Sequence, residues 1–321
     1  MPVNEFELIE QVFRHLTEED GSVLCGIGDD AAILRFPKDS DLVVTTDTLV
    51  NGVHFFADAR AYDIGVKSLA VNLSDMAAMS AQPRWITLSL TLPETDMDWL
   101  DSFSGGFANM ARRYNVSLVG GDITRGPLSI TCQVMGTVAD GGGIRRNGAR
   151  PEDAVYVSGR LGLAAVALRR LQDSQGGDSV SIPEACLERL LRPIPRVELG
   201  MALAGTAAAM IDLSDGLAGD MGHILKASGA GAEIDLDSLP VSEEGAGFSS
   251  REIVQMAVAG GDDYELCFTV PAEKETLLPT IAAEAGCPLT RIGRIIDGSG
   301  IRWLDAAGNE VDLDVESYHH F

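Results

Sequence analysis

Apolar residues along the first half of the chain recur either at helical spacing or in short continuous runs. Residues 5–16 and 61–81 carry apolar side chains three and four positions apart, which predicts a helix in each stretch. Residues 96–114 are amphipathic in the same way and predict a third helix. Alternating or β-branched runs predict strands at residues 31–34, 42–46, 85–92, 116–119 and 128–138.

The second half repeats this mixture. Strands are expected at residues 154–158, 210–212, 232–236 and 264–270, and helices at 195–208, 217–227 and 272–285. Between the halves lies Gly141–Gly148, a basic and glycine-rich loop that is typical of a domain junction. We therefore expect an α+β protein with two domains, residues 1–148 and 149–321.

One stretch of the first domain organises the remaining motifs. Gly26-Ile-Gly-Asp-Asp30 is a glycine turn with two carboxylates, and Thr45-Thr-Asp47 closes the strand expected at 42–46. Glycine lets the backbone approach a ligand closely, and aspartate offers the hard oxygen atoms that Mg²⁺ prefers. Similar Asp-bearing turns recur as Asn72-Leu-Ser-Asp75, Gly120-Gly-Asp122, Asp212-Leu-Ser-Asp-Gly216 and Gly260-Gly-Asp-Asp263.

Each of these aspartates taken singly has an ordinary structural explanation, as a helix cap or a turn residue. Their repetition at Gly and Ser turns favours a scaffold that gathers carboxylates around metal-bound phosphates. The chain lacks the glycine-rich Lys-Ser/Thr loop of P-loop enzymes. Arg145 and Arg146, in the glycine-rich loop, could contact phosphates, or they could form a solvated basic turn.

Composition narrows the class of protein further. The chain has 321 residues, 45% hydrophobic content and a formal net charge of −24, which argues against nucleic acids and anionic membranes as partners. Its five scattered cysteines lack a Cys-x-x-Cys pair and indicate reduced thiols in the cytoplasm. No apolar run is long enough to span a bilayer, and the first residues do not read as a signal peptide.

His54 lies shortly after Asp47 and is a candidate substrate contact, although a single histidine more often has a structural role. The end of the chain, Ser317-Tyr-His-His-Phe321, is aromatic for a tail and could dock on another part of the protein.

Taken in order, these motifs resemble the thiamine-monophosphate kinase family. The resemblance rests on the Asp-bearing motifs named above, on Thr124-Arg-Gly126 after Asp122, on Tyr264-Glu265 after Asp263, and on the aromatic end. The family belongs to a superfamily named after aminoimidazole ribonucleotide synthetase. Membership implies a two-domain fold, a homodimer that pairs the N-terminal sheets, and a C-terminal α/β sandwich.

The resemblance also implies an activity, in which ATP phosphorylates thiamine monophosphate to thiamine diphosphate with several Mg²⁺ ions. The first domain would bind ATP and Mg²⁺ and form the dimer, and the second would complete the active site. Whether K⁺ assists is open. The implied metal ligands are Asp30, Thr45, Thr46, Asp47, Asp75, Asp122, Asp212 and Asp215, among which Asp30, Asp47, Asp75, Asp122 and Asp215 are the expected catalytic residues. The implied ATP contacts are Tyr114, Gly121, Asp122, Arg146 and Ser214, and the implied thiamine contacts are His54, Asp263 and Tyr318 or Phe321.

Other functions stay open at this point. Selenophosphate synthetase would require a reactive cysteine with a nearby lysine, and Cys25 has no such lysine. A hydrogenase maturation factor would require a C-terminal cysteine, whereas this chain ends in Phe321. Aminoimidazole ribonucleotide synthetase itself and a non-catalytic divalent-cation-binding protein are the remaining alternatives.

Overall fold

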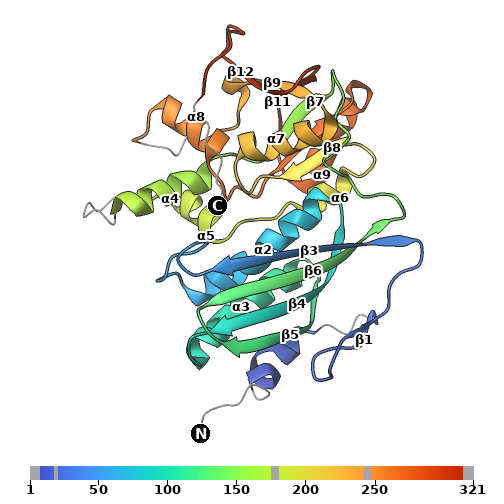
Figure 1. The fold of residues 1–321 in the computed structure, drawn as a ribbon, viewed down its shortest axis with the longest axis vertical. Helices are drawn as coiled ribbons and strands as arrows, with labels where there is room; N and C mark the ends of the chain where they lie inside the picture. Colours follow the sequence, from blue (N-terminus) through green and yellow to red (C-terminus); the bar gives the residue numbers. More distant parts are fainter. Residues whose placement is uncertain (1–7, 18–20, 175–180, 242–246, 314–321) are drawn as a thin grey trace. The chain divides into compact units, whose positions relative to one another are not determined.

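The structure, a computed structural model, describes residues 8–17, 21–174, 181–241 and 247–313. The chain forms two compact units, which are described separately (Figure 1). The first comprises Met1–Met76 and Ala81–Gly141, and the second comprises Ala77–Ser80 and Gly142–Phe321. The division falls in the glycine-rich loop that the sequence suggests as a junction.

A four-stranded sheet forms the centre of the first unit, with the strand order β3-β6-β4-β5. The edge strand β3 (Ser40–Val50) pairs antiparallel with β6 (Ser129–Ala139), which pairs antiparallel with β4 (Gln82–Leu92). Strand β5 (Ser117–Arg125) runs parallel to β4 at the other edge. Two short strands, β1 (Val23–Cys25) and β2 (Ile33–Leu34), pair separately beside the glycine turn.

Helices α2 (Ala61–Ala78) and α3 (Met97–Arg113) lie on one face of this sheet (Figure 1). Asp96 caps α3, since its carboxylate accepts the Trp99 N–H at 3.2 Å. The expected N-terminal helix is present as a π-helix, Ile9–Phe13, followed by a 3₁₀ turn, Arg14–Leu16. On the opposite face of the sheet, Leu42 and Val44 of β3 are 52% and 49% exposed.

Two glycines allow α2 and α3 to pack backbone against backbone. A Cβ atom on Gly65 would lie 2.1 Å from the carbonyl oxygen of Phe103, and one on Gly106 would lie 2.0 Å from that of Tyr62. Any larger side chain at either position would force the helices apart. This close packing holds α2, and therefore Asp75, firmly against the unit.

The second unit contains a six-stranded sheet with the order β12-β9-β11-β7-β10-β8. Its neighbours are antiparallel except for the β12–β9 pair, which is parallel. The strands are β7 (Ala154–Ser158), β8 (Ala209–Asp212), β9 (Gly231–Asp235), β10 (Leu266–Val270), β11 (Leu289–Ile296) and β12 (Gly300–Leu304).

Helices cover both faces of this sheet. Leu217 and Ile224 of α7 (Leu217–Ser228) and Val258 of α8 (Ser250–Ala259) share one apolar core with alternate strand residues. On the other face Tyr156 stacks on Phe268 and donates its hydroxyl to Glu275 at 2.8 Å. The remaining helices are α4 (Leu163–Ser174), α5 (Glu184–Leu191), α6 (Val197–Ala202) and α9 (Leu278–Ala285), with 3₁₀ segments at Leu236–Ser238 and Ala272–Leu277.

The α+β class and most of the expected elements are confirmed, but two expected strand ends are wrong. Strand β3 does not end at Asp47, because its pairing with β6 continues to Val50. Gly120-Gly-Asp122 is not a turn after its strand but part of β5, because it pairs with β4 beyond an irregularity in register.

Two expected helices are also wrong in extent. The helix expected at 195–208 is confined to α6, since Gly205 with φ of 71° adopts a left-handed conformation that ends helical structure. The helix expected at 272–285 is a 3₁₀ segment followed by α9, because Pro279 lies in the first turn of α9 and cannot donate within a continuous helix. Helices α5 and α8 were not expected at all.

Within the described ranges, every helix is too short or too polar to cross a membrane. Four of the cysteines are buried, and Cys25 is partly exposed. Cys132 and Cys267 are fully buried, and burial raises the pKa of each thiol to about 12.

The close packing of α2 on α3 leads to a matched pair of glycine variants. We expect Gly106→Ala to lower the free energy of unfolding by about 2 kcal/mol or more, because its methyl group would clash with the Tyr62 carbonyl oxygen. Its neighbour Gly105 is exposed, and a Cβ atom there would meet no other atom within 4 Å, so Gly105→Ala should raise stability by up to about 1 kcal/mol. Urea unfolding followed by circular dichroism measures both, and equal effects of the two substitutions would contradict this packing.

Candidate active site

The glycine turn of the first unit forms one wall of a pocket of about 620 Å³. The turn residues 26–32 line the pocket together with residues 118–123 of β5 and with Thr87 and Leu88 of β4. Ile9 and Phe13 supply an apolar wall, which the sequence did not suggest. The pocket brings together three of the predicted site residues, Asp30, Gly121 and Asp122.

Gly121 is required by the approach of two strands. A Cβ atom there would lie 1.9 Å from the carbonyl oxygen of Leu88, so any other residue would push β5 away from β4. The register of the β4–β5 pairing shifts between Ile86 and Thr87, just before Leu88 pairs with Gly121. The pocket floor is therefore bare backbone, which suits close approach of a ligand.

The two aspartates of the glycine turn have different roles. The Asp29 carboxylate accepts the backbone N–H of Asp30 at 2.9 Å and the Cys25 thiol at 3.5 Å. Both aspartates are exposed and line the pocket, but the Asp29 carboxylate also holds the turn through these two contacts.

A second group of predicted residues lies between β3 and α2. The Thr45 hydroxyl donates to the Asp75 carboxylate at 2.5 Å, and Asn72 accepts the backbone N–H of Asp47 at 3.1 Å. Burial, together with the negative charge of Asp75, raises the pKa of Asp47 to about 6. Asn72 is fully buried, so it fixes the position of Asp47 relative to α2.

This pair of carboxylates fits a divalent cation by its chemistry. Two acidic side chains repel each other unless a positive charge or a proton intervenes, and oxygen atoms are what Mg²⁺ binds. In the described part of the chain, however, no three or more His, Cys, Asp or Glu side chains cluster closely enough to hold a metal by themselves. Any ion here would complete its coordination with hydroxyl, backbone, water or substrate oxygens.

Thr46 differs from its neighbours on β3. Successive side chains of a strand point to opposite faces, so Thr46 lies on the face away from Thr45 and Asp47. Its hydroxyl accepts a hydrogen bond from Gln133 on β6 at 3.3 Å. Thr46, one of the predicted metal ligands, could therefore bind an ion held by Asp47 only through its backbone oxygen.

The pocket and the Asp47–Asp75 pair lie at the same level of the sheet. Asp47 is in register with Cys132, Cys132 with Leu88, and Leu88 with Gly121. The two edge strands are three strand spacings apart, roughly 14 Å. The fold thus aligns motifs that are far apart in the sequence, in two neighbouring groups.

Two further predicted site residues of this unit, His54 and Tyr114, are not among the residues that line the pocket. The His54 ring nitrogen Nδ1 accepts the backbone N–H of Val50 at 3.0 Å, and Lys67 donates to the His54 carbonyl oxygen at 3.3 Å. These bonds fix His54 in the turn after β3. Tyr114 is buried at the end of α3 under the Arg113 guanidinium and is not among the residues that line the pocket.

In the second unit two of the predicted motifs interlock. The Leu213 N–H donates to the Glu265 carbonyl oxygen, and the Tyr264 N–H donates back to that of Leu213, both at 2.8 Å. The Asp262 N–H donates to the Ser214 carbonyl oxygen at 2.9 Å. The motif that carries Asp212, Ser214 and Asp215 therefore lies directly against Gly260–Glu265.

Asp220, which the sequence analysis did not single out, holds the first of these loops. Its carboxylate accepts the backbone N–H of Asp215 at 2.9 Å. Burial is the main cause that raises the pKa of Asp220 to about 7, and the charge of Arg146 acts in the opposite direction. Arg146 and Ser214, both predicted to contact ATP, are thus near the same carboxylate. An acid in the first turn of a helix is the signal that could have identified Asp220.

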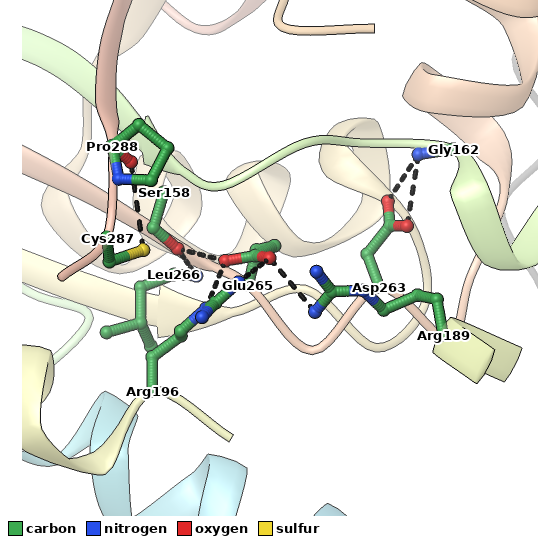
Figure 2. A network of polar contacts seen from close by, with 9 residues as sticks. All are labelled: Ser158, Gly162, Arg189, Arg196, Asp263, Glu265, Leu266, Cys287 and Pro288. Atoms are coloured by element: carbon green, nitrogen blue, oxygen red, sulfur yellow. Dashed lines mark hydrogen bonds and ion pairs between the residues drawn. The ribbon is translucent and has the colours of Figure 1, made fainter. Parts of the chain in front are cut away.

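Asp263 is almost fully buried, and both of its carboxylate oxygens accept the Gly162 N–H, at 2.9 and 3.0 Å (Figure 2). Burial raises the pKa of Asp263 well above its ordinary value. The Asp263 side chain thus holds Gly162, the residue before α4. Its predicted contact with thiamine stays a prediction.

Next to Asp263, a network of charged groups surrounds the fully buried Glu265 (Figure 2). Arg196 donates to both Glu265 oxygens, at 2.7 and 2.5 Å, and Arg189 lies 3.1 Å from one of them. Ser158 donates to Glu265 at 2.5 Å and accepts the Leu266 N–H at 2.8 Å. The network anchors the start of β10, which pairs through Leu266 with Asp212. Sequence reasoning named Glu265 only as part of a motif and missed both arginines, since they lie far away in the chain.

Comparison with known proteins places both units in one family. Residues 28–138 match the N-terminal domain of AIR synthase related proteins, and residues 150–304 match the corresponding C-terminal domain. The fold and the site thus define a two-domain protein of the AIR synthase related class.

Relatives over the whole chain narrow the family. Thiamine-monophosphate kinases of Salmonella typhimurium and Escherichia coli K12 are each 43% identical over 323 residues, covering 100% of this chain and 99% of theirs. The crystal structure of the kinase from Stenotrophomonas maltophilia K279a is 46% identical with a TM-score of 0.87, covering 97% of this chain and 99% of that one. AaThiL complexed with AMPPCP and TMP is 30% identical with a TM-score of 0.77, covering 99% and 97%. The chain belongs to the thiamine-monophosphate kinase family.

The repulsion between Asp47 and Asp75 leads to a prediction about stability and pH. With chelator at pH 8, we expect Asp47→Asn to raise the free energy of unfolding by roughly 1–3 kcal/mol, because it removes a charge whose ionisation the folded state opposes. The folded-state pKa of about 6 lies above the ordinary 3.8. The advantage of the variant should therefore shrink as the pH falls from 6 towards 4, because the folded state protonates Asp47 first, and it should vanish below the ordinary pKa of 3.8, where Asp47 is protonated in both states.

Urea unfolding at pH 8 and pH 4 measures this difference, and Asp101→Asn on the exposed face of α3 is the control. Adding Mg²⁺ at pH 8 should stabilise the wild type more than Asp47→Asn. A variant that is less stable than the wild type in chelator at pH 8 would show that Asp47 is a structural residue.

Proposed function

We propose that this protein transfers the γ-phosphoryl group of ATP directly to thiamine monophosphate and releases thiamine diphosphate and ADP. The observation that carries the proposal is the family match over the full chain, with the relatives' names and the AMPPCP and TMP complex of AaThiL. The Asp-bearing motifs that motivated it lie in two groups in the first unit and one in the second.

The chemistry of the acceptor agrees with a site dominated by carboxylates. A phosphate oxygen of thiamine monophosphate is already ionised at neutral pH, so attack on ATP requires no strong general base. Positioning and charge neutralisation then supply most of the catalysis. Two phosphate esters repel each other, and cations held by aspartates relieve that repulsion. The cationic thiazolium of thiamine also suits an acidic protein.

Specific residues would carry these tasks. We assign Gly121, Asp122, Arg146 and Ser214 to ATP, where the bare backbone at Gly121 permits close approach and Arg146 offers a bidentate contact to phosphate. His54 and Asp263 are assigned to thiamine monophosphate. Tyr318 and Phe321 keep their sequence-based assignment to thiamine and lie outside the described residues. Tyr114 is assigned to the adenine of ATP, and this contact requires that the nucleotide displace the Arg113 guanidinium from the Tyr114 ring.

Mg²⁺ is the proposed metal. Asp47, Asp75 and Thr45 would hold it in one place, Asp30 and Asp122 in another, and Asp212 and Asp215 in the second unit, with the backbone of Thr46 as a further ligand. Bound there, Mg²⁺ supplies positive charge to the phosphate oxygens. The role of Asn72 is to keep Asp47 opposite Asp75, and that of Asp220 is to hold the Asp215 loop in place. An additional role for K⁺ is left open.

We also propose that two copies pair through their N-terminal sheets. The exposed apolar side chains of Leu42 and Val44 on the sheet face opposite α2 support this arrangement, since a partner would remove them from water. Residues 1–148 would then bind ATP and Mg²⁺ and form the dimer, and residues 149–321 would contribute Asp212, Ser214 and Asp215. The reduced cysteines support a cytoplasmic enzyme.

A hydrogenase maturation role is a weaker candidate. The structure of HypE in complex with ATP has a TM-score of 0.75 at 20% identity, a likeness that concerns the fold alone. A role as a divalent-cation-binding protein without catalysis leaves the backbone-floored pocket unexplained.

Coupled ADP release tests the proposed reaction. In the presence of ATP and Mg²⁺, we expect turnover with thiamine monophosphate and none with free thiamine or aminoimidazole ribonucleotide precursors. Asp47→Ala should abolish transfer, because it removes a charge from the proposed phosphate site, and should keep the circular dichroism spectrum, because the fold opposes the ionisation of this carboxyl.

Asp101→Ala, on the exposed face of α3, is the matched control and should retain full activity. Turnover of free thiamine alone, or of none of the substrates, would refute the proposed function. Loss of folded structure in Asp47→Ala would instead point to a structural aspartate.

A further inference from the structure

Helix α7 connects two of the proposed nucleotide contacts. At its start, Asp220 accepts the backbone N–H of Asp215 at 2.9 Å and so holds the loop that carries Ser214. At its last residue, Ser228, the helix contacts the loop that carries Arg146. The helix between them is buried along Leu217, Met221 and Ile224, so its two ends move as one body.

Ser228 makes an unusual number of contacts for a helix-terminal serine. Its hydroxyl oxygen accepts the backbone N–H groups of Gly148 and Ala149, each at 3.2 Å. The same hydroxyl donates to the carbonyl oxygen of Arg146 at 3.1 Å. One side chain therefore satisfies three backbone groups of the segment 146–149.

Strand β8 holds the opposite side of this segment. The Met210 N–H donates to the Arg145 carbonyl oxygen at 3.1 Å. A Cβ atom on Gly148 would lie 2.0 Å from the carbonyl oxygen of Ala208, so Gly148 is packed directly on the residue that precedes the strand. The backbone on either side of Arg146 is fixed, while the Arg146 side chain itself is exposed.

We propose that Ser228 is a positioning residue that pre-forms the Arg146 segment for the phosphates of ATP. This inference rests on the proposed function, in which Arg146 contacts the nucleotide. Without the Ser228 hydroxyl, the backbone of residues 146–149 would lose these three hydrogen bonds, and the freedom so gained would have to be removed when ATP binds. Ordering a flexible segment on binding lowers affinity, and prior fixation removes that cost.

The first experiment measures binding of AMPPCP by isothermal titration calorimetry, without turnover. Ser228→Ala should weaken binding roughly 3- to 10-fold, the effect of about one lost hydrogen bond. Ser228→Thr keeps the hydroxyl and should restore affinity. In the kinase assay Ser228→Ala should raise KM for ATP by a similar factor, while kcat and KM for thiamine monophosphate stay unchanged.

Ser238→Ala is the matched control. Its hydroxyl donates to Asp235 at 2.6 Å in the same unit, in a 3₁₀ turn that makes none of these contacts with residues 145–149. It should leave AMPPCP affinity unchanged. If Ser228→Ala does not fold, Ser228→Cys replaces it, because a thiol of similar size is a much weaker hydrogen-bond donor.

A double-mutant cycle tests whether Ser228 acts through Arg146. In an Arg146→Ala background, Ser228→Ala should cause little further loss of affinity, since the side chain that it positions is gone. A full additional loss would overturn the inference, as would unchanged AMPPCP affinity in folded Ser228→Ala, an equal loss in Ser238→Ala, or a wild type that does not bind AMPPCP. A wild type that binds AMPPCP but does not phosphorylate thiamine monophosphate would refute the proposed function and leave this binding test valid.

Discussion

The repulsion between Asp47 and Asp75 is the constraint on which the first unit depends. Folding brings these two carboxylates together at a partly buried place, where burial and the Asp75 charge raise the pKa of Asp47 to about 6. Buried Asn72 and the Thr45 hydroxyl hold the pair in place, and the glycine contacts between α2 and α3 hold the helix that carries Asp75. Stability is given up to keep acidic oxygens at a defined position, which is what a cation site for phosphate chemistry requires.

In the second unit, by contrast, a buried carboxylate is paired with positive charges of the protein itself. Glu265 is fully buried, but two arginines and a serine neutralise and solvate its carboxylate inside the protein. Removing one partner of such a group leaves an uncompensated buried charge and typically costs about 3–5 kcal/mol. The role of Glu265 is therefore to anchor the end of β8, which carries Asp212, and the loop after it, which carries Asp215. The contrast separates acids that the protein satisfies itself from acids left for a ligand.

The sequence was sufficient to predict the α+β class and the order of most elements, because apolar periodicity reports which face of each segment is buried. It also identified Asp30, Gly121 and Asp122, which the fold brings into one pocket. It placed the end of β3 at Asp47, whereas this strand continues to Val50, so Asp47 keeps the strand alternation and Thr46 faces away from it. Arg189, Arg196, Asp220 and Ser228 were missed for another reason: their roles arise from contacts across 69 or more residues, or from hydrogen bonds to backbone, which leave little local signal.

The central claim is that the Asp47–Asp75 pair is a cation site that serves phosphate transfer. Anomalous diffraction from crystals grown with Mn²⁺ and AMPPCP tests it most directly, because it locates the metal independently of activity. The account predicts an anomalous peak within about 2.5 Å of carboxylate oxygens of both Asp47 and Asp75. A map with the nucleotide bound, metal at its phosphates and no peak at this pair would contradict it.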